Sequence, residues 1–150
     1  MKKFKFGKNW KNFLKVLNEK RIKEAEISLK ELTGLNNLKE KTFVDIGCGS
    51  GIFSLAARNL GASVYSFDCD EEAIECAKIL KNKFYKDDEI WKIEKGDILN
   101  REYVESLKKF DIIYIWGVVH HTGNMWRAME NLLYFVKNDS YLIISVYNDQ

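Results

Sequence analysis

The segment TFVDIGCGSG, residues 42–51, begins with a mostly apolar run that contains one acid, Asp45, and continues with a glycine at every second position. Its β-branched and aromatic residues predict a short buried strand over 42–46. Glycines at 47, 49 and 51 let the backbone turn sharply and let a ligand approach where a Cβ would clash. Apolar residues at helical spacing then run from Ile52 to Leu60, and Gly61 ends that helix. The segment therefore predicts a strand, a glycine turn and a helix.

The alternation of strand and helix continues toward the C-terminus. Further strands are predicted over 63–67, 90–93, 110–115 and 141–146, and further helices over 71–84, 101–108 and 125–136, with Asp70 and Asn124 as N-caps. Nearly continuous apolar strands that alternate with helices indicate a parallel sheet covered on both faces. With right-handed crossovers, the prediction is an open, doubly wound, Rossmann-like α/β domain with strand order 3-2-1-4-5.

The sequence before the first strand has a different character. Apolar positions from Trp10 to Leu32 recur at spacings of three and four, which predicts a helical segment in two pieces that Gly34 ends. Basic residues outnumber acidic ones nine to one over residues 1–23. This basic head could contact nucleic acid, an anionic surface or the acidic body, or it could be a solvated helix face. We expect a single domain, with the helical segment over 1–36 and the core over 37–150.

Composition excludes several classes of protein. With 46% hydrophobic and 13% aromatic residues in 150, the chain is globular and large enough for one core. Its longest apolar run is far shorter than the roughly 18 residues of a membrane span. The three cysteines lack the paired spacing of metal ligands. We therefore expect reduced thiols, a cytoplasmic protein and no metal site.

Polar side chains follow the predicted strands at their carboxyl ends, where ligands bind in open α/β sheets. Asp68 follows the second strand, 23 residues after Asp45. An acid there accepts two hydrogen bonds from a ribose diol and repels a 2′-phosphate. Asp97 and Ile98 follow the third strand, where a carboxylate can accept from the exocyclic amine of adenine and an apolar side chain can cover the ring. Together these positions indicate an adenosine-bearing cofactor.

Two other nucleotide-binding loops fit the glycines less well. The dinucleotide fingerprint G-x-G-x-x-G requires Gly or Ala where Ile52 stands, so an NAD-dependent oxidoreductase is a weaker interpretation. A P-loop requires Gly-Lys-Ser/Thr, which does not follow here.

These motifs resemble those of class I S-adenosylmethionine-dependent methyltransferases. The resemblance covers about residues 20–150 and rests on VDIGCGSG at 44–51, Asp68, GDI at 96–98 and the strand over 110–115. The stretch WGVVHHTG at 116–123, followed by Met125 and Trp126, resembles the small-molecule branch that includes ubiquinone-biosynthesis O-methyltransferases and related bacterial enzymes. The resemblance implies S-adenosyl-L-methionine as cofactor and direct in-line methyl transfer to a small-molecule acceptor.

The resemblance also implies a role for each matching residue. Asp45 would hold the ammonium group of the methionine portion, and Trp116 would lie near that portion. Asp68 would bind the ribose hydroxyls, while Asp97 and Ile98 would bind the adenine. The loop along the cofactor would consist of Gly47, Cys48, Gly49 and Gly51.

Both histidines of the chain follow the fourth strand, and either could be the base that a hydroxyl acceptor needs. His121 is the first candidate, because related O-methyltransferases often place a histidine near the acceptor at this position. His120 is the second. The alternative is that one histidine only stabilises the loop before the helix over 125–136.

Two motifs of nucleic-acid methyltransferases are missing. Enzymes that methylate the amino group of adenine carry Asp/Asn-Pro-Pro-aromatic after the fourth strand, where this chain has WGVV at 116–119 and no proline anywhere. Cytosine C5 enzymes need a nucleophilic cysteine after that strand. We therefore expect a small-molecule acceptor and no nucleic-acid partner.

The chain departs from the family in two places. The turn before the fifth strand reads KNDS at 137–140 instead of a Lys-Pro-Gly-Gly type, although Asn and Asp tolerate positive φ. The family sheet has two further strands, so we expect a C-terminally truncated domain whose fifth strand, over 141–146, is an exposed edge that promotes self-association. The alternative function is a non-catalytic or incomplete S-adenosylmethionine-binding module that needs a partner or the missing strands.

Overall fold

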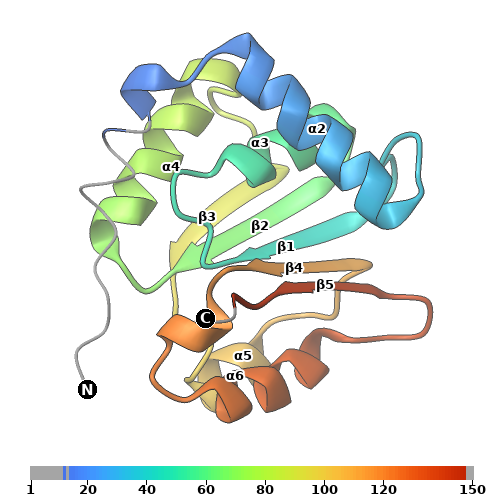
Figure 1. Cartoon of the computed structure of the whole chain (residues 1–150), viewed down its shortest axis with the longest axis vertical. Helices are drawn as coiled ribbons and strands as arrows, with labels where there is room; N and C mark the ends of the chain where they lie inside the picture. The colour runs from blue at the N-terminus through green and yellow to red at the C-terminus, as the bar shows by residue number, and fades with distance from the viewer. Residues whose placement is uncertain (1–11, 13, 148–150) are drawn as a thin grey trace.

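The computed structural model of the chain describes residue 12 and residues 14–147 (Figure 1). Its sheet has five parallel strands in the order β3-β2-β1-β4-β5, which confirms the predicted fold class and strand order. The strands are β1 (Thr42–Ile46), β2 (Ser63–Asp68), β3 (Trp91–Lys95), β4 (Ile112–Trp116) and β5 (Tyr141–Ser145). The helices are α2 (Glu19–Thr33), α3 (Ile52–Asn59), α4 (Glu71–Phe84), α5 (Arg101–Ser106) and α6 (Met125–Leu132), with 3₁₀ turns η1 (Val119–His121) and η2 (Leu133–Phe135).

Helices cover both faces of the sheet, with α2, α3 and α4 on one face and α5 and α6 on the other (Figure 1). Side chains alternate along each strand, so the inner strands contribute to two hydrophobic cores, whereas the end strand β3 contributes Trp91 and Ile93 on the face of α2, α3 and α4. In β1, Phe43 belongs to the core under α2 and α3, whereas Val44 belongs to the core under α5 and α6. This burial on both faces is why the strands are nearly continuous apolar runs.

Polar and glycine caps define the helix ends. The side chain of Asp70 accepts a hydrogen bond from the backbone N–H of Glu72 at 2.9 Å, and that of Asn124 accepts one from Arg127 at 3.2 Å. Both predicted N-caps are therefore confirmed. Gly34 ends α2 in the left-handed conformation, with a φ of 70°.

Several element boundaries differ from the sequence prediction; for example, β4 begins at Ile112 rather than at residue 110, and α5 ends at Ser106 rather than at residue 108. The helix predicted over 125–136 is α-helical only to Leu132 and tightens into η2, which buries Phe135 completely. The third strand continues to Lys95 rather than ending at Ile93, because its backbone stays in register with β2 to the end of that strand.

The N-terminal helix α2 is part of the first core. Its buried residues Ile22, Ala25 and Leu29 pack in the same cluster as α3. Most of the basic head lies in residues 1–11 and 13, outside the described residues, so the prediction for it stays open. Within residue 12 and residues 14–147, the helices are too short or too polar to cross a lipid bilayer.

Candidate active site

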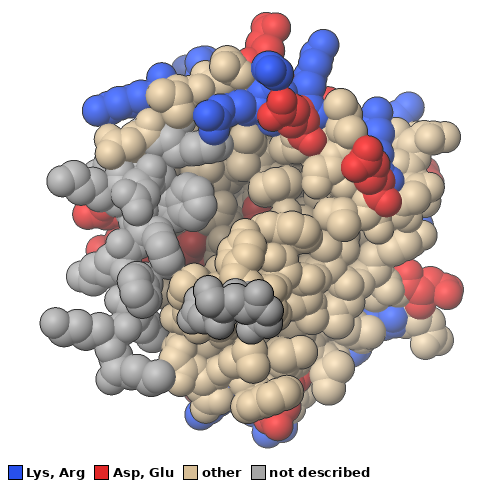
Figure 2. All heavy atoms as spheres, in the orientation of Figure 1, with Lys and Arg blue, Asp and Glu red and all other residues tan. Residues whose placement is uncertain are grey.

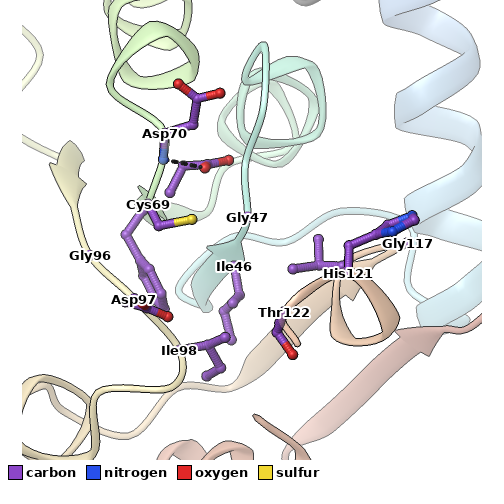
Figure 3. Close-up of a pocket in the computed structure, with 13 residues that line it drawn as sticks. Ile46, Gly47, Cys69, Asp70, Gly96, Asp97, Ile98, Gly117, His121 and Thr122 are labelled. Carbon is purple, nitrogen blue, oxygen red and sulfur yellow. Dashed lines mark hydrogen bonds between the residues drawn. The ribbon is translucent and has the colours of Figure 1, made fainter. Parts of the chain in front are cut away.

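A pocket with a cavity volume of about 100 Å³ lies at the carboxyl ends of the central strands (Figure 3). The site residues that sequence analysis named and that line it are Gly47, Asp68, Asp97, Ile98 and His121. The remaining lining residues, to which sequence analysis gave no individual role in the site, are Ile46, Phe67, Cys69, Asp70, Gly96, Gly117, Val118 and Thr122. Figure 3 shows Asp97 and Ile98 on one side of the pocket and His121 on the opposite side.

Both backbone conformation and close packing require glycines in the loop after β1. Gly47, Gly49 and Gly51 have φ values of 67°, 55° and 85°, in the left-handed region. A Cβ on Gly47 would lie 2.6 Å from a methyl group of Val118, in the loop after β4. The two loops can approach each other so closely only because residue 47 has no side chain.

Asp68 joins the glycine loop to the start of α4. Its Oδ2 accepts a hydrogen bond from the backbone N–H of Gly49 at 3.0 Å, and its Oδ1 accepts one from that of Asp70 at 2.9 Å. Burial raises the pKa of the Asp68 carboxyl, while the hydrogen bonds from Asp70 and Gly49 lower it. Each carboxylate oxygen can accept a further hydrogen bond, so the group retains capacity for a diol in the pocket.

Contacts with α5 and α6 hold Asp97 and Ile98 in place. The carbonyl oxygen of Ile98 accepts a hydrogen bond from Asn131 Nδ2, on α6, at 2.7 Å. A Cβ on Gly96 would lie 2.3 Å from the ring of Tyr103, on α5, so a larger residue at this turn would displace that ring. The side chain of Asp97 accepts a hydrogen bond at 2.9 Å from the backbone N–H two residues further on.

Asp45 lies near the end of β1 with 3% of its surface exposed and does not line the pocket. Ser54 Oγ donates a hydrogen bond to its Oδ2 at 2.6 Å. Burial raises the pKa of the Asp45 carboxyl to about 7, the Ser54 hydrogen bond lowers it, and the charge of Asp68 raises it. None of the ion pairs between described residues involves Asp45. A cation brought close to this carboxylate would favour its ionised form.

Five residues that sequence analysis assigned to the cofactor lie outside the pocket lining, namely Asp45, Gly49 and Gly51, described above, and Cys48 and Trp116. Cys48 is buried against Ile74 and Ala77, and burial raises the pKa of its thiol, so it has the environment of a packing thiol. Trp116 is 40% exposed and stacks on Tyr114, with ring centroids 5.9 Å apart and an interplanar angle of 10°. It lies at the end of β4, and Tyr114, on which it stacks, belongs to the core under α2 and α3.

The two histidines occupy different positions in η1. His121 lines the pocket, and its backbone N–H donates to the carbonyl oxygen of Val118 at 2.9 Å. The ring of His120 lies 3.9 Å from that of His121 and packs edge-on against Tyr147 at 5.3 Å, centroid to centroid. The geometry thus gives His121 the more direct access to the pocket.

The fold and the pocket are those of a Rossmann-like α/β domain with its ligand site at the carboxyl ends of the strands. A family model described as a methyltransferase domain matches residues 17–150, and the chain belongs to that family. A ubiquinone biosynthesis O-methyltransferase of Glaesserella parasuis is 31% identical over 75% of this chain and 48% of its own length. A ribosomal protein L11 methyltransferase of Helicobacter hepaticus is 32% identical over 75% of this chain and 38% of its own length. The chain thus spans about half or less of these curated relatives.

Solved structures of methyltransferases share the fold. A SAM-dependent methyltransferase from Aquifex aeolicus superposes with a TM-score of 0.66 at 23% identity, over 90% of this chain and 71% of that one. Magnesium protoporphyrin IX methyltransferase from Synechocystis, solved with bound SAM, gives a TM-score of 0.64 at 19% identity, over 77% of this chain and 54% of that one. At these identities the likeness establishes the fold alone.

Proposed function

We propose that this chain binds S-adenosyl-L-methionine and transfers its methyl group to a small-molecule acceptor. The pocket is the observation that supports this proposal best, because it brings Asp68, Asp97 and Ile98 together beside the glycine loop at one edge of the sheet. The solved Synechocystis relative, which shares the fold, has SAM bound.

Three features of the chain fit this cofactor. Asp45 is a buried carboxylate outside the ion pairs of the described residues, which suits an ammonium group. The buried hydroxyl of Ser50, in the glycine loop, has no hydrogen-bond partner among the described residues, and a polar ligand group beside the loop would supply one. Asp68 and Asp97 offer acceptor oxygens at the pocket wall for a ribose diol and an exocyclic amine.

When bound, the cofactor supplies an electrophilic methyl group on a sulfonium centre. The chain's own residues must orient the acceptor and exclude water, and positioning of this kind lowers a barrier by roughly 7–11 kcal/mol. His121 lies across the pocket from Asp97, and we expect an imidazole nitrogen of this residue to take the proton from a hydroxyl acceptor. His120, packed against it, is the second candidate.

A protein acceptor is the second candidate, because some relatives of this chain are ribosomal protein L11 methyltransferases. A small molecule is favoured by the WGVVHHTG loop, which places a histidine in the pocket wall.

Calorimetry and a transfer assay test the proposal. We expect S-adenosylhomocysteine to bind the 150-residue chain in a one-to-one complex, and labelled S-adenosylmethionine to methylate at least one member of a panel of small hydroxylated or amino compounds. His121→Ala should keep the S-adenosylhomocysteine affinity and lower turnover by about 10²–10⁴-fold. Cofactor binding without transfer to any small molecule would favour the protein acceptor or the non-catalytic module. Binding of NAD in place of S-adenosylhomocysteine would overturn the proposal.

A further inference from the structure

A chain of buried polar side chains runs from β3 to the end of β1, on the sheet face that α3 covers. Trp91 Nε1 donates a hydrogen bond to Ser66 Oγ at 2.9 Å, and the hydroxyl oxygens of Ser66 and Ser54 lie 2.6 Å apart. Ser54 Oγ donates in turn to Asp45 Oδ2 at 2.6 Å. Trp91, Ser66 and Ser54 are all fully buried. Most polar groups this deep in a core have hydrogen-bond partners, and here each group serves as partner to the next in the series.

The direction of these hydrogen bonds is fixed at the Trp91 end. An indole N–H can only donate, so Ser66 Oγ must accept from it. The Ser66 hydroxyl hydrogen is then available for Ser54, and the Ser54 hydrogen is available for Asp45. The opposite order would direct two donors at Ser66 Oγ and leave the Ser66 hydrogen without an acceptor in the chain. Every donor is therefore aimed toward the carboxylate, an arrangement that favours its ionised form.

We propose that Ser54, Ser66 and Trp91 are positioning residues that hold the Asp45 carboxylate ionised and correctly oriented for the ammonium group of the cofactor. This proposal rests on the proposed function, since the ammonium group belongs to S-adenosyl-L-methionine. Ser54 fixes one carboxylate oxygen directly, whereas Ser66 and Trp91 act through Ser54.

The surroundings of Asp45 show why such donors are needed. Burial raises its pKa to about 7, against the lowering effect of Ser54. The titratable groups that face it are Asp68 on β2, Cys48 in the glycine loop and Tyr114 on β4, and none of these carries a positive charge. The helix packed against it, α3, contributes the Ser54 hydroxyl. Removing the donors would leave the carboxyl protonated at neutral pH, and a protonated carboxyl attracts an ammonium group weakly.

The test compares two probes that differ in the ammonium group. S-adenosylhomocysteine carries the amino-acid portion, whereas 5′-methylthioadenosine carries the adenosine and lacks that portion. For Ser54→Ala at pH 7.5, we expect calorimetry to show an affinity for S-adenosylhomocysteine about 10- to 100-fold lower, as for a lost hydrogen bond to a charged group. The affinity for 5′-methylthioadenosine should stay within about twofold of the wild-type value. Ser63→Ala, which removes an exposed hydroxyl from β2, is the matched control and should change neither affinity.

A pH profile separates this role from a structural one. Wild-type affinity for S-adenosylhomocysteine should fall as the pH drops through about 7, because Asp45 takes up a proton. In Ser54→Ala the midpoint should move to higher pH, and in Trp91→Phe, which leaves Ser54 and Asp45 unchanged, it should move in the same direction by less. Affinity for 5′-methylthioadenosine should not follow this profile.

Two outcomes would contradict the proposal in different ways. If both probes bind the wild type but Ser54→Ala and Trp91→Phe weaken them equally or leave the midpoint in place, the positioning role is wrong and the cofactor assignment stands. If neither probe binds the wild type, the proposed function fails and the positioning role fails with it. Circular dichroism on each variant identifies any that does not fold, and Trp91→Phe then serves in place of Ser54→Ala.

Discussion

At the scale of single residues, the ligand-free fold is destabilised by the carboxylate that the cofactor needs. Burial raises the folded-state pKa of Asp45 from 3.8 to about 7. The stability linked to this group is therefore complete below pH 3.8 and is lost as the pH rises through about 7. Above that pH the folded state contains a buried carboxylate outside the ion pairs of the described residues, which is the state best suited to bind an ammonium group.

Asp45→Asn should separate stability from binding. The amide oxygen still accepts from Ser54, but the buried charge is gone, so we expect a higher melting temperature than wild type at pH 8. The difference should shrink toward pH 5, where the wild-type carboxyl is protonated, while affinity for S-adenosylhomocysteine falls at pH 8. Thermal denaturation followed by circular dichroism at both pH values measures this, with the exposed Asp139→Asn as control. An equal difference at both pH values would mean that packing, rather than charge, is responsible.

Asp68→Ala should weaken S-adenosylhomocysteine binding by about 1–3 kcal/mol, the usual cost of leaving buried hydrogen-bond groups unpaired. The substitution also releases the backbone N–H groups of Gly49 and Asp70. Asp68→Asn retains one acceptor oxygen and should lose less affinity. Calorimetry measures the affinity of both variants for S-adenosylhomocysteine. An unchanged affinity in Asp68→Ala would refute the assignment of this residue to the ribose.

At the scale of elements, strands and helices follow from apolar periodicity, glycines and capping residues, and the strand ends predict where carboxylates gather. Asp68 and Asp97 were predictable because parallel strands end at the same edge. The contact of Val118 with Gly47 and that of Tyr103 with Gly96 were not, because each joins segments whose distance depends on how loops pack. The Trp91 chain needs the register of three strands and one helix, which no local pattern contains.

The packing of the two loops can be tested with glycine substitutions. Gly34 has a φ of 70° and open space around it. Gly34→Ala should therefore lower the free energy of unfolding only by the cost of placing alanine in a left-handed conformation, about 1–2 kcal/mol. Gly47 has a similar φ, 67°, and its Cβ would also clash with Val118. Urea denaturation should therefore show a clearly larger decrease in the free energy of unfolding for Gly47→Ala than for Gly34→Ala. Adding Val118→Ala to Gly47→Ala should remove the contribution of the clash, so that the decrease in the free energy of unfolding becomes similar to that of Gly34→Ala. Equal decreases in the free energy of unfolding for Gly34→Ala and Gly47→Ala would show that the loop after β4 moves away from the added methyl group at no energetic cost.

At the scale of the whole molecule, charge is unevenly distributed over the surface. In Figure 2, charged side chains gather over α2, while the surface over β4 and β5 is mostly uncharged. The exposed apolar residues at this end of the sheet include Leu142, Val146 and Tyr147, which are 41%, 50% and 58% exposed. β5 is the end strand of the sheet, and backbone groups on an end strand can pair with another chain.

We propose that two copies of this chain associate through β5. Sedimentation velocity of the 150-residue chain should show a sedimentation coefficient that rises with concentration. Leu142→Lys places a charge on the edge strand and should abolish that rise, whereas Ile79→Lys, on exposed α4 surface, should not. A wild-type chain that remains monomeric at high concentration would contradict the proposal.

The placement of Trp91 has an optical consequence. Its indole is fully buried and is joined through two hydroxyl groups to Asp45, whereas Trp116 and Trp126 are 40% and 70% exposed. Iodide in the solvent should quench the emission of Trp116 and Trp126 and leave that of Trp91, and a Trp10→Phe variant removes the fourth tryptophan, which lies outside the described residues. A change of charge on the carboxylate alters the electric field along the hydrogen bonds that lead to the indole, so the emission of Trp91 should shift when a proton or a cation arrives. The protein therefore contains an intrinsic fluorophore that reports, without a label, on the charge state of its buried acid.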